Sequence, residues 1–95
     1  MTISGLDNLN KQMKELKFAA DALDGEYAVN FDAHDPVSIE NAIQEAYSMV
    51  DQRAGKYSSN SLVVPLIEQT KESLREHILN SAEERRLKGD VEDDN

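Results

Sequence analysis

The spacing of apolar residues predicts three helices. Between residues 6 and 23 the apolar positions step by three and four, which is an unbroken heptad seam. A second apolar stripe at helical spacing covers residues 39–54, and a third covers residues 63–82. The seam consists of Leu6, Leu9, Met13, Leu16, Ala20 and Leu23. These patterns predict a mainly α fold built from three amphipathic helices.

Residues that favour helix ends bound these stripes. Gly25 follows the first stripe and suits the left-handed conformation that often ends a helix. Asp35-Pro36 opens the second, because Asp is a preferred cap and Pro a preferred first helical residue. Gly55 closes the second helix, and Lys88-Gly89 is expected to end the third. Residues 1–89 are thus expected to form a single small helical domain.

A short segment, about residues 26–32, follows a two-residue period instead. Tyr27, Val29 and Phe31 alternate with small or polar residues, which predicts a strand-like segment between the first and second helices. No second strand of similar quality follows, because Pro65 interrupts the other β-branched run. Two interpretations stay open. Tyr27, Val29 and Phe31 mark a strand that pairs with a second copy or another protein, or they belong to an extended linker packed over the helices.

The seam of the first helix also allows two interpretations. About two and a half heptads is short for an autonomous coiled coil, so the seam packs on its own domain or mediates self-association. Phe18 lies off the seam, which means that the apolar face is wider than the seam or that this ring is exposed. A chain of this length buries only roughly 60–65% of its unfolded surface. Because it has no cysteine, disulfides cannot stabilise it, and we expect a homo-oligomer.

The net charge of −9 is concentrated in two places. Residues 24–37 carry four acids and no base, and residues 90–95 carry four acids and no base. The last six residues have almost nothing to bury and are predicted to form a disordered acidic tail.

Since no basic stripe exists, nucleic-acid binding is not expected. No segment approaches the roughly 18–20 apolar residues of a membrane helix, no secretory signal opens the chain, and a cytoplasmic location is expected.

Candidate chemistry is sparse. Asp32-Ala33-His34-Asp35 is the one cluster that resembles a site, but one His supplies too few ligands for a structural zinc, and Asp35 is better explained as a helix cap. His77 lies next to the apolar stripe of the third helix and is expected at the edge of the core. The chain has no Gly-x-Ser-x-Gly elbow and no glycine-rich phosphate loop. We expect no enzyme activity, no cofactor, no metal and no small-molecule substrate.

Two segments carry a resemblance to phage proteins. The opening Ile3-Ser4-Gly5-Leu6-Asp7-Asn8-Leu9, running into Lys14-Glu15-Leu16, resembles the start of small tail-completion or minor tail proteins of tailed bacteriophages. The middle, from Phe31-Asp32 to Lys56-Tyr57, is similar to short proteins of prophage structural regions. The resemblance implies a structural or assembly accessory protein that contacts other phage structural proteins, in the cytoplasm of a bacterial host or on the virion.

A different class of function is the alternative. A small acidic chain can act as a regulatory inhibitor that occupies a basic surface of a host or phage protein. Such mimicry needs acids ordered on one face, whereas here the acids lie in a connector and a tail. Protein–protein contact without catalysis is common to both hypotheses.

Overall fold

Three α-helices and one 3-10 turn make up the chain in the computed structural model, which describes residues 3–93 and the side chains of residues 6–89. The elements, in order, are α1 (Ile3–Leu23), α2 (Pro36–Ala54), η1 (Gly55–Tyr57) and α3 (Val63–Asp93). The predicted mainly α fold is confirmed.

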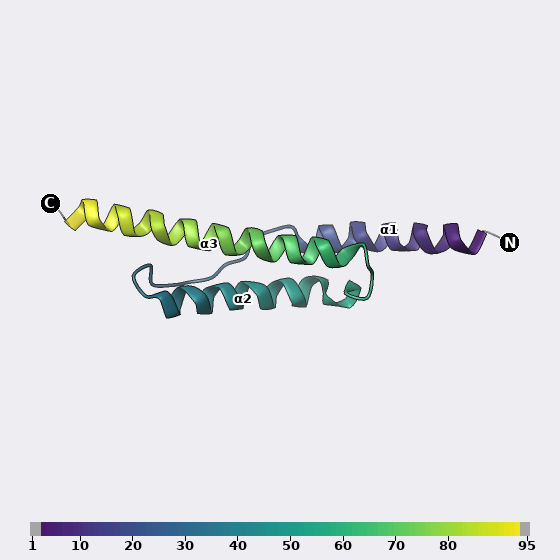
Figure 1. The fold of residues 1–95 in the computed structure, drawn as a ribbon, viewed down its shortest axis with the longest axis horizontal. Helices are drawn as coiled ribbons and strands as arrows, with labels where there is room; N and C mark the ends of the chain where they lie inside the picture. The colour runs from purple at the N-terminus through teal and green to yellow at the C-terminus, as the bar shows by residue number, and fades with distance from the viewer. Residues whose placement is uncertain (1–2, 94–95) are drawn as a thin grey trace.

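The helices form a long, thin molecule. α2 and α3 lie side by side as an antiparallel hairpin, and α1 continues beyond one end of it, roughly in line with α3 (Figure 1). The molecule measures 74 × 18 × 16 Å, with the N-terminus and C-terminus at opposite ends (Figure 1). α1 therefore contacts the hairpin and the turn before α3 mainly through its C-terminal half.

The predicted start of α2 is confirmed in detail. The Asp35 carboxylate accepts a hydrogen bond from the amide of Val37 at 3.0 Å, and Pro36 is the first helical residue. This side chain satisfies one of the amides that a helix start leaves without a partner. The apolar stripe of α2 is buried as predicted, through Ile39, Ala42, Ile43, Ala46, Val50 and Ala54. Gly55 follows the last residue of α2, also as predicted.

The predicted end of α3 is wrong. The helix continues through Lys88-Gly89 to Asp93, and Gly89 does not take the positive φ of a left-handed cap. A contact far along the chain holds this part of α3, because the Arg86 guanidinium donates to the carbonyl of Ala33 at 2.9 Å. A β-carbon at Gly89 would lie 3.8 Å from Nε2 of His34, so this turn of α3 packs beside the turn before α2. Residues 94–95 of the predicted tail lie outside the described residues.

The core consists of two apolar clusters along the hairpin. The first joins all three helices and contains Ala19, Leu23, Val50, Ala54, Val63 and Ile67. The second lies nearer the start of α2 and contains Ala33, Ile39, Ile43, Ala46, Ile78 and Ala82. α1 contributes buried residues to the first cluster alone, and α2 contributes to both. The position of α1 thus depends on one short contact region.

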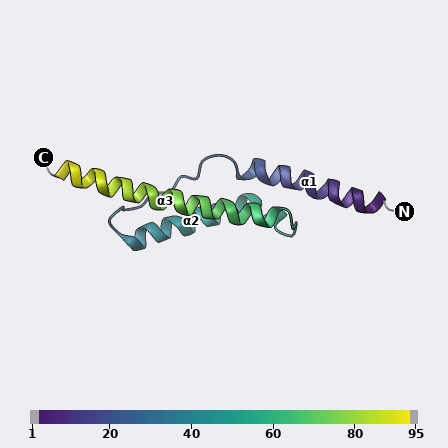
Figure 2. The same cartoon turned by 45° about the horizontal axis from the view of Figure 1, so that its top comes forward.

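The connector between α1 and α2 is extended and lies over the hairpin (Figure 2). Gly25 takes a φ of 114°, which turns the chain after α1 as predicted. The Tyr27 hydroxyl donates to the carbonyl of Leu23 at 2.7 Å, and the Arg53 guanidinium lies 3.9 Å from the centre of the Tyr27 ring. Arg53 also donates to the carbonyl of Glu26 at 2.6 Å. These contacts fix the path of the chain where it leaves α1.

Within residues 3–93 the connector forms no β-strand and packs over the helices, whereas its pairing with a second copy or another protein stays a prediction. Its two-residue alternation is real. Tyr27 packs on the first cluster, and Val29 and Phe31 pack on the second, while Ala28 and Asn30 are exposed. The apolar face that suggested a strand is therefore occupied by the chain's own hairpin.

Candidate protein-interaction surface on helix α1

The heptad seam of α1 divides into two parts. Leu23 is buried and Leu16 is half-buried, and both pack on the first core cluster. Three large seam residues in the N-terminal half of α1 have no such cover, namely Leu6, Leu9 and Met13, with exposed fractions of 63%, 46% and 55%. We call these three residues the α1 stripe. The C-terminal half of the seam thus packs on its own domain, and self-association through the exposed half stays a prediction.

The face of α1 that packs on the hairpin is not centred on the seam. Ala19 is fully buried, whereas the seam residue Ala20 is exposed. Successive residues of an α-helix are about 100° apart, so Ala20 lies on the same side of α1 as Leu9 and Met13. This side of α1 faces away from the first core cluster and is left uncovered.

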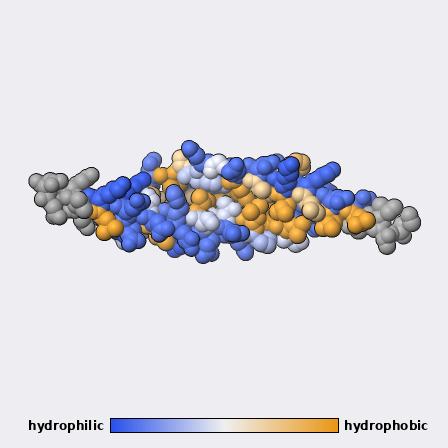
Figure 3. Space-filling model, turned by 90° about the horizontal axis from the view of Figure 1, so that it is seen from above, coloured by the Kyte–Doolittle hydropathy of each residue, from blue (hydrophilic) through white to orange (hydrophobic). Residues whose placement is uncertain are grey.

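The part of α1 that carries the α1 stripe projects from the rest of the molecule. The N-terminal half of α1 projects past the end of the α2–α3 hairpin in two views (Figures 1 and 2). Apolar surface extends over this half of the molecule toward the N-terminus (Figure 3). A projecting helix with three large exposed apolar side chains is a candidate contact surface for another protein.

A buried polar side chain holds the base of this projecting helix. Asn60 is only 4% exposed, and its Nδ2 donates to the carbonyl of Gln12 and to Oε1 of Glu15, both at 3.0 Å. Its Oδ1 accepts from the amide of Leu62 at 2.9 Å, just before α3 begins. The local sequence pattern did not indicate this contact, because Asn60 lies 48 positions from Gln12 and 45 from Glu15.

The predicted strand-pairing residues lie against the hairpin. Tyr27, Val29 and Phe31 line a small cavity of about 130 Å³, together with His77 and Arg85 of α3. The Arg85 guanidinium lies 4.5 Å from the centre of the Phe31 ring. Within the described chain, no backbone hydrogen bond reaches residues 27–31. What the connector still offers to a partner is its backbone edge, and not its apolar face.

The Asp32–Asp35 cluster stabilises a turn. One oxygen of Asp32 accepts from the amide of His34 at 2.9 Å, and the Asp32 amide donates to Oγ of Ser38 at 2.8 Å. Asp35 caps α2. Among the described side chains, no group of three or more His, Cys, Asp or Glu residues is arranged to hold a metal ion.

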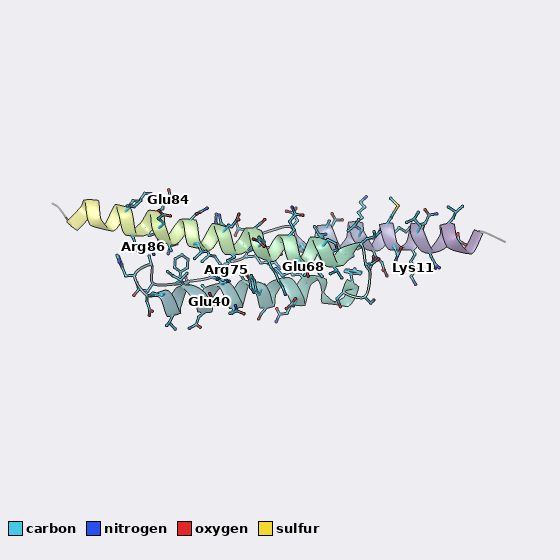
Figure 4. All side chains as sticks on the ribbon, viewed as in Figure 1. Lys11, Glu40, Glu68, Arg75, Glu84 and Arg86 are labelled. Carbon is cyan, nitrogen blue, oxygen red and sulfur yellow. The ribbon has the colours of Figure 1, made fainter. Side chains whose placement is uncertain are left out.

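Ion pairs connect the two helices of the hairpin. Glu40 of α2 and Arg75 of α3 point toward each other and lie 3.2 Å apart (Figure 4). Lys71 and Asp51 form a second pair at 2.9 Å. The Gln44 amide donates to Glu40 at 2.9 Å and lowers the pKa of the Glu40 carboxyl below its ordinary value, and Arg75 lowers it further. Because these side chains are solvated, the ion pairs contribute little to the free energy of unfolding. They mainly favour one register of α2 against α3.

Comparison with known proteins assigns the chain to a family. The family model described as YuaX matches residues 3–89, which include α1, α2 and almost all of α3. The chain belongs to the YuaX family. It is 62% identical over 84 residues to "Uncharacterized protein YuaX" of Escherichia coli (strain K12), and the match covers 88% of each chain. No solved structure matches the chain.

The YuaX match includes both segments that resemble phage proteins, and the description of the family states no activity. A role in phage assembly thus stays a prediction. In the described residues, no helix combines the length and the apolar character needed to cross a membrane.

Proposed function

We propose that this member of the YuaX family acts without catalysis, through protein–protein contacts, and that it associates with copies of itself through the α1 stripe. The observation that carries the proposal is the exposure of Leu6, Leu9 and Met13 on a helix that projects from the domain. Burying an apolar side chain of this size contributes about 1.5–3 kcal/mol when the burial is complete. Three such residues from each of two copies supply the apolar centre of such a contact.

A second copy suits this surface for two reasons. Two α1 helices that cross in opposite directions place the same apolar residues on both sides of the contact, as a two-fold symmetric interface requires. Each α1 carries three lysines and three acids, so a pair of these helices has no net charge to repel it. The stripe itself contains no charged residue.

The structural or assembly role implied by the resemblance to phage proteins is compatible with such a contact surface, and it is proposed on that ground alone. The alternative of an acidic inhibitor has less support. Asp32 and Asp35, two of the four connector acids, accept hydrogen bonds from the backbone of a turn and are not arrayed toward a partner. Mimicry of phosphate charge needs its acids free on one face.

Sedimentation velocity over a range of concentrations tests the proposal. In chains that end at Gly89, so that residues 90–95 make no contact, Met13→Lys places a charge in the centre of the stripe and should weaken association at least tenfold. Asn8→Lys adds the same charge to the same exposed part of α1, but roughly 140° away around the helix, and should leave association unchanged. Circular dichroism should show equal helix content in all three proteins. A wild-type chain that stays monomeric at high micromolar concentration would contradict the proposal, as would equal effects of the two variants.

A further inference from the structure

A second surface of α1 has a different chemistry. Phe18 is 54% exposed, and its ring and that of Tyr57 lie along a shallow groove of about 440 Å³ between α1 and η1. Its lining residues are Lys11, Lys14, Glu15, Phe18, Lys56 and Tyr57. We call it the α1–η1 groove. Phe18 lies roughly 140–180° around the helix from Met13 and Leu9, so the groove and the α1 stripe face opposite ways.

The groove is basic, although the chain as a whole is acidic. Three lysines line it against a single acid, Glu15, whose Oε1 already accepts from Asn60 at 3.0 Å. The Lys56 ammonium lies 5.2 Å from the centre of the Tyr57 ring, within the range of a cation–π contact. Lys11 lies on the projecting part of α1 (Figure 4). A groove that combines ammonium groups with aromatic rings favours the binding of an acidic segment that also carries an apolar side chain.

The chain itself contains a segment with that composition. Residues 90–95 read Asp-Val-Glu-Asp-Asp-Asn, which is four acids, one apolar residue and no base. This segment cannot reach the groove of its own chain. α3 ends at the far end of a molecule 74 Å long (Figure 1), and the two residues after Asp93 span at most about 7 Å. An occupant with this sequence must come from another copy.

We propose that the α1–η1 groove binds the C-terminal segment, residues 90–95, of a second copy of this chain. Each copy has the groove toward one end and the segment at the other, so the contact is head-to-tail and leaves one groove and one segment free. Such heterologous contacts propagate into open chains unless they close into a ring. The contact uses a different face of α1 from the stripe, and it therefore does not rest on the contact proposed above.

Mixing two complementary variants tests this contact. Both are made in the Met13→Lys background, so that the α1 stripe does not contribute. One carries Lys14→Glu and Lys56→Glu, which removes the groove and keeps the segment. The other ends at Gly89, which removes the segment and keeps the groove. Each alone should sediment as a monomer, whereas their equimolar mixture should form a 1:1 dimer. Only a head-to-tail contact gives this pattern.

A direct binding measurement complements the mixing test. A fluorescent peptide of residues 86–95 should bind the chain that ends at Gly89, and high salt should weaken this binding because charges dominate the contact. Lys14→Glu in that chain should weaken binding at least tenfold. Lys17→Glu makes the same charge change on the same helix but outside the groove, and should have less than a twofold effect. Association of the groove variant with itself, a mixture that stays monomeric, or equal losses for Lys14→Glu and Lys17→Glu would overturn the proposal.

Discussion

Replacing Asn60 by Ala should destabilise the whole domain, because this side chain connects α1 to the turn before α3. It is 4% exposed and makes three side-chain hydrogen bonds, two to residues of α1 and one to the amide of Leu62. Ala keeps the backbone path but removes all three. The projecting part of α1, which carries the α1 stripe, then loses its side-chain hydrogen bonds to the turn before α3.

The size of the effect follows from the three bonds. A neutral hydrogen bond contributes about 0.5–1.5 kcal/mol net, and a bond to a charged group such as Glu15 contributes about 1.5–3. Glu15 is half-buried and regains water when its partner is lost, which reduces the sum. We expect a loss of about 2–3 kcal/mol from the free energy of unfolding. For a domain of this size, whose stability is typically about 5–14 kcal/mol, that loss lowers Tm by roughly 10–20 °C.

Urea denaturation followed by helix ellipticity measures the loss. Ser59→Ala, at an exposed position of the same turn, is the control and should change stability by less than about 0.5 kcal/mol. Asn60→Asp keeps the acceptor for Leu62 but sets a carboxylate beside Glu15. It should therefore be less stable than wild type at neutral pH, because two carboxylates then lie close together. A cost below about 0.5 kcal/mol for Asn60→Ala would refute the role assigned to this residue.

Two further predictions concern the connector. Arg53→Ala removes the guanidinium 3.9 Å above the Tyr27 ring and its bond to the Glu26 carbonyl, and should cost about 1–2 kcal/mol in urea denaturation, with Arg53→Lys recovering only part. Ala28→Pro removes an amide from the exposed backbone edge and should abolish any pairing with a partner strand while helix content stays the same. Retention of every partner recovered by pull-down with Ala28→Pro would show that the connector is only a linker.

Helix starts and turns were predictable because their causes are local. Asp35 caps α2 through an amide two residues away, and Gly25 takes a positive φ that its missing β-carbon permits. The alternation of Tyr27, Val29 and Phe31 was also correct as an inward-facing pattern. Periodicity identifies which side chains share a face, and that much depends only on backbone geometry.

The segment that packs against each apolar face could not be predicted from local sequence in the same way. The connector alternation suited both a strand and a linker, and only the structure shows that its apolar face lies on α2 and α3. The end of α3 was predicted at Lys88-Gly89 on local grounds. The structure carries the helix further, and Arg86 contacts Ala33, 53 residues away along the chain. A local signal of about 1 kcal/mol, such as one glycine in a helix, yields to such contacts.

The seam of α1 shows the division between sequence and structure most clearly. Its heptad spacing was sufficient to define an amphipathic helix. Which seam residues are core and which are surface depends on where the α2–α3 hairpin ends and on which side of α1 it packs. The hydrogen bonds of Asn60 and the lining of the α1–η1 groove likewise join residues that are more than 35 positions apart in the sequence. Only the fold brings these residues together. Local interactions determine the elements, and burial between distant segments determines which surfaces remain free for a partner.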